Sequence, residues 1–314
     1  MSARRLSTVL LSIVGLWLAV FLAIRVVPGD PAAILLGERA TAADQARLRE
    51  RMHLAGPLWQ QLAGAAGDVL DGSMGTSYAL AGRPRAVRAL LSEAIGPTGV
   101  LAFAALLVAV AIAIPLGSLA ARSRGGLFDG FGRGIALIAM STPVFVSGPL
   151  AIVLFAVTLQ WAPTPAHPPS ALRELALPAL VLGFALAARL SRLLRATLLA
   201  ELAGPLADAL RARGHSEPRI WMRHLLPNAL VPLLAVIGGQ LGALLGGAIV
   251  TEKIFGRPGL GTLLLDAIAA RDPAVVQGAV LAIAVAYALV LGTVDALVAR
   301  IDPRTRARAD EATA

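Results

Sequence analysis

The sequence predicts an all-α membrane protein, a multi-pass bundle of about six transmembrane helices. Of its 314 residues, 57% are hydrophobic and only 15% are charged, with a mean hydropathy of +0.75, outside the balance of a soluble domain. Several apolar runs reach the roughly 20 residues that a helix needs to cross the hydrocarbon core. The net charge of +9 comes from arginines between these runs, without the interleaved aromatics of a nucleic-acid-binding surface, so we expect no nucleic-acid partner.

Six runs account for this prediction, and each is apolar on all faces, as a buried or lipid-facing helix should be. They cover approximately residues 6–27, 94–121, 134–159, 175–194, 226–250 and 274–298. The first run is longer than the apolar part of a secretory signal, so we expect it to remain in the membrane. The chain thus divides into an N-terminal span (1–27), an external segment (28–93), a core of five spans (94–303) that includes a polar insert (201–228), and a tail (304–314).

Arginines in the short connections predict how the chain crosses the bilayer. Alternate connections are basic and contain Arg4, Arg5, Arg122, Arg124, Arg133, Arg189, Arg192, Arg195, Arg211, Arg213, Arg219, Arg223, Arg300, Arg304, Arg306 and Arg308. The opposite connection after the fifth span is balanced in charge, with Lys253, Arg257 and Arg271 beside Glu252, Asp266 and Asp272. We therefore expect both termini to lie in the cytoplasm.

The external segment shows signals for two short amphipathic helices. In "TAADQARLRERMHL", Thr41 is an N-cap candidate and apolar residues recur at helical spacing. A second helical pattern follows in "LWQQLAGAAGDVL" (58–70), and "DGSMGTSYALAGRP" has turn chemistry before the second span.

Residues suited to covalent chemistry or metal binding are scarce. A phosphate-binding loop needs a lysine in a Gly-rich turn, but the only lysine is Lys253. Cysteine is absent, and the four histidines (His53, His167, His215 and His224) show no metal-site spacing. We therefore expect no catalytic residue, no metal and no cofactor bound by this chain.

The polar insert "ELAGPLADALRARGHSEPRIWMRHLLPN" (201–228) interrupts the apolar pattern. Pro205 suits the first position of a helix and Gly214 its end. Between them, Leu206 and Leu210 fall on one face, while Arg211 and Arg213 favour the C-terminal end of the helix dipole. One interpretation is an interfacial helix on anionic headgroups, and the other is a contact with a partner chain.

The spacing in this insert resembles the EAA loop of membrane subunits of ATP-binding-cassette importers. Its E-A-A positions hold Asp208, Ala209 and Leu210, its glycine is Gly214, its isoleucine position holds His224, and its final Leu-Pro pair is Leu226 and Pro227. Pro205 and Leu206 stand where an acidic-aromatic pair is usual, Asp208 replaces the usual glutamate, and His224 replaces an apolar residue. These departures concern the details of ATPase docking.

Further motifs are similar to those of the dipeptide, oligopeptide and nickel permeases. They are "PGDP" (28–31), "LWQQL", "GSMGTSYA", the stretch "TEKIFGRPGLGTLLLDAIAARDPAVVQG" and the C-terminal "IDPRTRAR". The resemblance implies the permease architecture of a type I importer in a bacterial cytoplasmic membrane. It also implies a second homologous permease, two cytoplasmic ATPases that bind ATP and Mg²⁺, and an external solute-binding protein that delivers peptides, nickel complexes or other small solutes.

The resemblance assigns two groups of site residues. For coupling to the ATPase these are Leu206, Ala207, Asp208, Ala209, Leu210, Arg211, Arg213, Gly214, Leu226 and Pro227. For an external gate or a receptor-docking loop they are Glu252, Phe255, Pro258, Gly259 and Gly261, the two glycines permitting a tight re-entrant turn.

Gly238, Gly242 and Gly246 recur every four residues in the fifth span, a pattern that lets helices approach closely in lipid. The stripe predicts either packing within the chain or a face toward the second permease or the pathway. Gln240, an amide within the same span, either lines the pathway or hydrogen-bonds to a neighbouring helix.

Two rival classes remain at this point. A secondary transporter or channel without an ATPase predicts ionisable residues within the spans or broken helices in inverted repeats, and neither is clear in the sequence. A membrane scaffold would not need a spaced polar insert. The sequence therefore favours the permease of an importer driven by ATP bound to other chains.

Overall fold

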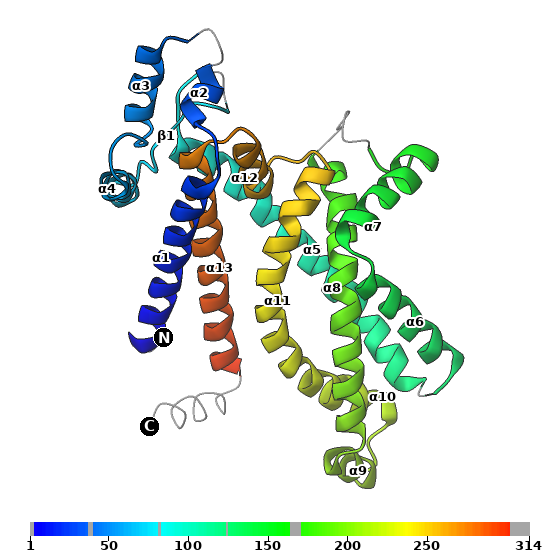
Figure 1. Ribbon diagram of the computed structural model, residues 1–314. Helices are drawn as coiled ribbons and strands as arrows, with labels where there is room; N and C mark the ends of the chain where they lie inside the picture. The colour runs from blue at the N-terminus through cyan, green and yellow to red at the C-terminus, as the bar shows by residue number, and fades with distance from the viewer. Residues whose placement is uncertain (1–2, 37–39, 81–82, 124, 164–170, 302–314) are drawn as a thin grey trace. The chain divides into compact units, whose positions relative to one another are not determined.

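The protein is helical almost throughout, which confirms the predicted fold class (Figure 1). A computed structural model describes residues 3–36, 40–80, 83–123, 125–163 and 171–301. Its contacts divide into two compact units, Met1–Gly99 with Gly256–Ala288, and Val100–Phe255 with Leu289–Ala314. Among the described residues, five stretches are long and apolar enough to cross a membrane: Ser7–Val26, Val87–Arg122, Arg173–Leu202, Glu217–Gln240 and Pro273–Val294.

The first unit contains most of the external segment. Its elements are α1 (Ala3–Val26), α2 (Pro31–Leu36), α3 (Ala42–Arg51), α4 (Leu58–Leu70), the start of α5 (Val87–Arg122), α12 (Leu260–Ala269) and the start of α13 (Pro273–Ile301). Two short strands, β1 (Thr76–Ser77) and β2 (Arg85–Ala86), pair antiparallel, with Thr76 opposite Ala86. A small core gathers apolar side chains from α5, α12 and α13, including Val87, Leu260 and Val275.

Both predicted external helices are confirmed. Helix α3 begins at the predicted N-cap, where the Thr41 hydroxyl accepts a hydrogen bond from Asp44 N (3.2 Å) and the Asp44 carboxylate accepts one from Thr41 N (3.3 Å). This reciprocal pair is a capping box. Helix α4 covers the predicted residues. Helix α2 and the strand pair are additions that the sequence analysis did not foresee.

The second unit is a bundle of long helices. Its elements are the rest of α5, α6 (Leu127–Ser141), α7 (Val144–Ala151), the π-helical segment η1 (Ile152–Thr158), α8 (Ala171–Leu202), α9 (Pro205–Ala212), α10 (Glu217–Ile220), the π-helical segment η2 (Trp221–Leu225) and α11 (Leu226–Ile254). Helix α8 packs along α11 and against α6. The core of this unit is formed by α5, α8, α11 and the insert, with Leu101, Leu190 and Leu225 fully buried.

The predicted third span, 134–159, is wrong as a single helix. Helix α6 ends at Ser141, Thr142 is extended (φ −91°, ψ 114°), and α7 starts after Pro143. Proline disfavours the helical conformation of the residue before it and has no N–H for the helix. A second proline, Pro149, lies within α7, and η1 follows it. The described part of this region therefore consists of two shorter apolar segments.

Close helix packing in the second unit depends on glycine. A Cβ on Gly183 of α8 would lie 2.6 Å from the carbonyl oxygen of Ala105 in α5, and a Cβ on Gly117 of α5 would lie 2.9 Å from that of Ser191 in α8.

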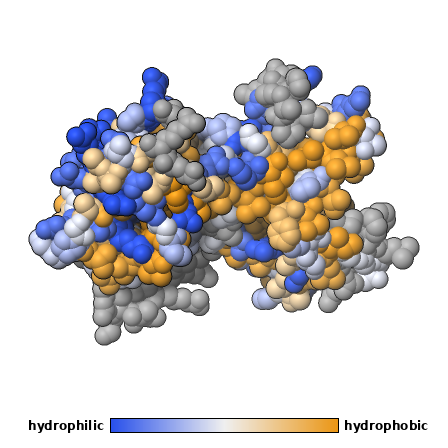
Figure 2. All heavy atoms as spheres, turned by 45° about the horizontal axis from the view of Figure 1, so that its top comes forward, coloured by the Kyte–Doolittle hydropathy of each residue, from blue (hydrophilic) through white to orange (hydrophobic). Residues whose placement is uncertain are grey.

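Hydrophobic side chains are also abundant on the exterior (Figure 2), among them Phe103, Leu107 and Ile138. An apolar exterior on long helices is what lipid contact requires.

Candidate functional site

The polar insert is a short helix followed by a sharp turn, as the sequence predicts. Pro205 is at the first position of α9 and follows Gly204, while Gly214 adopts a left-handed φ of 78° beyond its end. His215 N donates to the carbonyl of Leu210 (3.2 Å) across that turn. A side chain at Gly214 would be strained in this conformation.

Helix α9 of the insert is anchored by two buried side chains, Ala207 (0% exposed) and Leu210 (7%). Both join the core cluster of the second unit. Leu206 is 39% exposed, so Leu206 and Leu210 do not share a buried face. Ala207 takes that place because it is three residues before Leu210. Asp208 and Ala209 are exposed on the other side of α9.

Arg211 pairs with one carboxylate of α10, which joins the two helices, and with one carboxylate of its own helix α9. Its Nε donates to Glu217 (2.7 Å) and its Nη1 to Asp208 (3.0 Å). The Glu217 carboxylate, followed by that of Asp208, raises the pKa of Arg211 above its ordinary value. Arg213 is exposed and makes no ion pair within the described residues. The two arginines therefore differ, since Arg211 holds the insert together and Arg213 is available to a partner.

The segment after α9 returns to the bundle through aromatic contacts. The His215 and His224 rings lie 6.1 Å apart, a usual spacing for paired rings. His224, which departs from the EAA pattern, thus has a structural contact within the insert. The Arg122 guanidinium lies 4.6 Å from the centre of the buried Trp221 ring, a cation–π contact that the sequence analysis missed. Arg122 and Trp221 line an open groove of about 550 Å³.

The start of α11 carries the last two predicted coupling residues. Leu226 is half-buried and packs against the core, while Pro227 is exposed. Pro227 has no N–H, and the π-helical segment η2 immediately precedes α11.

The glycine stripe of α11 divides between two environments. A Cβ on Gly238 would lie 2.2 Å from Val294 of α13, so this glycine packs closely within the chain. Gly246 has no heavy atom within 4 Å of such a Cβ. The surroundings of Gly242 lie outside what the structure describes. Gln240 accepts a hydrogen bond from Arg189 Nη1 of α8 (3.0 Å), which is the predicted interhelical contact.

The location of Arg189, Arg192 and Arg195 corrects the sequence analysis. The charge rule counted all three with a basic connection, although the predicted span 175–194 already contained Arg189 and Arg192. Helix α8 continues to Leu202 and includes all three. Ionisable side chains thus occur within a predicted span, a feature that the sequence analysis did not recognise.

The C-terminal end of α11 contains two of the predicted gate residues. Glu252 is fully buried and Phe255 is 7% exposed. A Cβ on Gly148 of α7 would lie 3.2 Å from Ile254 and 3.6 Å from the Phe255 ring, so α7 packs closely here. Glu252 and Phe255 therefore belong to a packed helix end.

The predicted tight turn at Gly259 and Gly261 lies earlier, at Gly256, which has a φ of 62°. Gly259 is extended (φ 172°) and Gly261 lies inside α12, both buried, whereas Pro258 is exposed. The extended conformation of Gly259 is open to any residue. Leu260 N donates to the Thr98 hydroxyl (2.8 Å) and fixes the start of α12 on α5.

Three family-like motifs meet in the first unit at the start of α13. The fully buried Asp272 carboxylate accepts hydrogen bonds from Ser77 Oγ (2.7 Å), Ala79 N (3.3 Å) and Val275 N (3.2 Å). Arg271 Nη1 donates to the carbonyl of Pro28 (2.8 Å). The "RDP" residues thus bind both "PGDP" and "GSMGTSYA". The sequence analysis treated Asp272 only as a charge.

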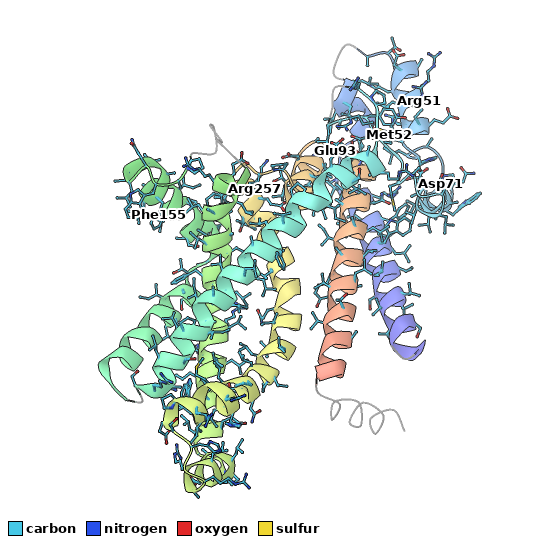
Figure 3. All side chains as sticks on the ribbon, turned by 180° about the vertical axis from the view of Figure 1, so that it is seen from behind. Arg51, Met52, Asp71, Glu93, Phe155 and Arg257 are labelled. Carbon is cyan, nitrogen blue, oxygen red and sulfur yellow. The ribbon has the colours of Figure 1, made fainter. Side chains whose placement is uncertain are left out.

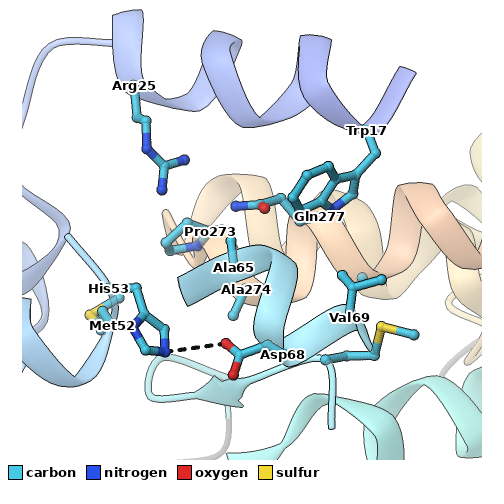
Figure 4. Close-up of a pocket in the computed structure, with 12 residues that line it drawn as sticks. Trp17, Arg25, Met52, His53, Ala65, Asp68, Val69, Pro273, Ala274 and Gln277 are labelled. Atoms are coloured by element: carbon cyan, nitrogen blue, oxygen red, sulfur yellow. Dashed lines mark ion pairs between the residues drawn. The ribbon is translucent and has the colours of Figure 1, made fainter. Parts of the chain in front are cut away.

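A small cavity of about 30 Å³ lies among α1, α4 and α13 (Figure 4). His53 Nε2 lies 3.4 Å from the Asp68 carboxylate at its edge. Burial raises the pKa of Asp68 above its ordinary value, although His53 opposes this. The buried Trp17 indole N–H has no hydrogen-bond partner among the described residues. The cavity is about the size of one water molecule, so it does not hold a solute.

Together, the helical bundle and its fastened insert define a multi-pass membrane transport subunit. Residues 113–307 match the family model described as "binding-protein-dependent transport system inner membrane component". The chain belongs to this family, the permease subunits of ATP-binding-cassette importers.

Individual relatives agree with this assignment. The chain is 35% identical to the "Di/tripeptide transport system permease protein DppB" of Pseudomonas aeruginosa, covering 97% of this chain and 98% of that one. It is 36% identical to the "Glutathione transport system permease protein GsiC" of Salmonella paratyphi A, covering 91% and 92%. A structure of the MetNI methionine ABC transporter, facing inward, superposes with a TM-score of 0.57 at 20% identity, covering 68% of this chain and 96% of that chain. At this sequence identity, the superposition shows a similar fold and nothing more.

Proposed function

We propose that this permease forms part of the pathway for peptides in an importer driven by ATP. The di/tripeptide and glutathione permeases to which the chain is similar support a peptide substrate. Nickel complexes and other small solutes are the alternative substrates that should be compared with peptides.

We further propose that the motor lies on other chains. Two cytoplasmic ATPases would bind ATP and Mg²⁺, a second homologous permease would complete the pathway, and an external binding protein would deliver the solute. This chain would bind no cofactor and perform no hydrolysis. Both termini and the insert would face the cytoplasm, in agreement with the basic connections on that side.

The observation that carries this proposal is the construction of α9. Ala207 and Leu210 fix the helix to the core, while Asp208 and Ala209 on its other side remain exposed. A helix held in this way transmits a push as a rigid-body movement of the helices to which it is attached. Closure of the ATPases would thus switch the bundle between inward-open and outward-open states.

Charge reversal at Arg213 tests this proposal. We expect Arg213→Glu to weaken co-purification of the ATPases and to lower ATP-dependent uptake, while membrane insertion is unchanged. Arg211→Glu should do the same and also loosen α10, because it loses two ion pairs. Arg51→Glu, at the end of α3 (Figure 3), is the matched control. Unchanged ATPase association and uptake in Arg213→Glu would count against the coupling role.

The substrate can be tested on the binding protein that works with this permease. Peptides and nickel should be titrated side by side by calorimetry, since the binding protein makes most of the selection in such importers. We expect saturable binding of short peptides. Binding of nickel complexes alone would replace the peptide assignment and leave the importer class intact.

A further inference from the structure

Arg189 of α8 lies within the length of helix that the hydrocarbon core must cover, and Arg192 lies about one turn further along the helix. Ala171 and Arg189 are separated by about 27 Å of helix, and the whole of α8 is about 48 Å long, at about 1.5 Å per residue. A hydrocarbon core about 30 Å thick includes Arg189 wherever it is placed along this helix. Gln240, its partner, is the midpoint of α11, so the guanidinium points to the centre of that helix and not to a headgroup region.

In the part of the chain that the structure describes, no carboxylate pairs with Arg189 or Arg192. Arg189 donates to the Gln240 amide oxygen (3.0 Å), and Arg192 Nη1 lies 3.2 Å from the sulfur of Met140 in α6. Neither makes an ion pair within the described residues, and both side chains are exposed. An exposed cation at this depth cannot face acyl chains, so it faces a water-filled pathway or a partner.

An apolar groove of about 870 Å³ leads to the same place. Val181 and Ala185 line it on α8, and Arg189 and Arg192 follow Ala185 by four and seven residues, on the same helical face. On α6, the lining residue Ala139 is next to Met140. The groove therefore runs along α8 toward the arginine pair.

The broken third span forms the other wall of the groove. Thr142, at the break, lines it, and so does Phe155 of η1, which is labelled in Figure 3. The carbonyl of Ile138 accepts hydrogen bonds from both Thr142 N (3.0 Å) and the Thr142 hydroxyl (2.8 Å), so the polar groups of Thr142 are bonded back to α6. Irregular backbone at membrane depth is tolerated where it lines a cavity.

We propose that Arg189 and Arg192 bind the carboxylate of the transported solute while its apolar part occupies the groove. The solute class is a short peptide with a free C-terminal carboxylate and apolar side chains. This assignment rests on the proposed function. Guanidinium groups bind carboxylates with paired hydrogen bonds. A phospholipid would fit the apolar walls, but its phosphate lies at the interface, whereas Arg189 contacts the middle of α11.

The test uses the complete transporter in vesicles, with the binding protein saturated with the tripeptide Ala-Phe-Ala as the free acid or as the C-terminal amide. Because the binding protein is the same throughout, a change in the acid-to-amide ratio of uptake rates comes from the permease. We expect the double variant Arg189→Gln/Arg192→Gln to lower this ratio about tenfold, equal to about 1.4 kcal/mol. Arg189→Lys/Arg192→Lys should keep much of the preference, and Arg51→Gln all of it.

An unchanged ratio in the glutamine variant overturns this inference, and so does an equal loss of both peptides, which indicates a structural role. Loss of a co-purifying anionic lipid, seen by native mass spectrometry with the ratio unchanged, assigns the arginines to lipid and also overturns it. Absence of ATP-dependent uptake in the wild type contradicts the proposed function itself. A lowered ratio supports the carboxylate site.

Discussion

The insert and the external segment both consist of short helices, but they are attached in different ways. Helix α9 has two buried residues, Ala207 and Leu210, in the core of its unit. Helices α3 and α4 have none. They are held by polar contacts. Arg49 of α3 forms an ion pair with Asp30, and Arg25 Nε of α1 donates a hydrogen bond to the Gln61 amide oxygen of α4 (2.8 Å).

This difference fits two mechanical roles. Buried apolar contacts depend on close packing and shift as a unit, so α9 is suited to transmit a movement. Exposed ion pairs contribute little and respond to salt and pH, so the external helices can adjust to a docking protein. The exception is Asp272, whose buried carboxylate fixes the start of α13 to the external segment.

The largest effect is expected from the anchor of α9. Leu210→Ala should destabilise the attachment of the insert by about 2–5 kcal/mol, because a buried leucine is lost. ATP-driven uptake should fall strongly, and protease cleavage of the insert should accelerate. Leu206→Ala is the matched control, since this leucine is exposed and its loss should leave the protease pattern unchanged. Equal effects of the two variants would remove the distinction between buried and exposed faces.

The second-largest effect, on the stability of the fold, is expected from the buried Asp272 carboxylate. Asp272→Ala leaves the Ser77 hydroxyl and two backbone N–H groups without their acceptor, at a cost of about 1–3 kcal/mol for each group that stays buried and unpaired. Thermal unfolding of the detergent-solubilised permease should occur at a lower temperature. Asp272→Asn should be milder, because it keeps an acceptor oxygen. A wild-type unfolding temperature for Asp272→Ala would refute the anchor.

A smaller effect is expected at Arg211, which is exposed. Arg211→Gln removes both ion pairs, so hydrogen exchange in α9 and α10 should accelerate by about twofold to fivefold, within the range of surface pairs. Arg213→Gln has no such pairs to lose and should exchange like the wild type. Faster exchange in both variants would show that the effect comes from net charge.

The smallest effect is the pH response of the external helices. The hydrogen bond from Arg49 holds the pKa of Asp30 below its ordinary value of 3.8. A lowered folded-state pKa adds stability above about 3.8 that is lost as the pH falls through the lower value. Arg49→Gln should therefore accelerate exchange in α2 and α3 at pH 7, and the difference from wild type should vanish once the pH falls below the lowered pKa of Asp30. A difference that persists there would contradict an ionic cause.

The sequence predicted those elements whose signals are local. The Thr41 N-cap of α3 and the Pro205 and Gly214 limits of α9 depend on neighbouring residues, and they are where the sequence indicated. The break at Thr142 also had a local signal in Pro143, which the continuous hydrophobicity of 134–159 obscured. Hydropathy alone cannot distinguish one helix from two.

The contacts that complete the site join residues far apart in the chain. Asp272 binds Ser77 across 195 positions and Arg189 binds Gln240 across 51. Such pairs depend on how the helices pack, which periodicity does not specify. The predicted span 175–194 included Arg189, but the contact of Arg189 with Gln240 depends on how α8 packs against α11.

The proposed contact between α9 and an ATPase can be tested directly, because the chain contains no cysteine. A single cysteine in Ala209→Cys, on the exposed side of α9, would carry a photo-activated maleimide cross-linker in the assembled transporter. The account predicts a cross-link to an ATPase subunit that changes in yield when ATP binds, and none from Glu50→Cys in α3. An intact, active complex in which Ala209→Cys labels only lipid, with no cross-link to an ATPase, would contradict it.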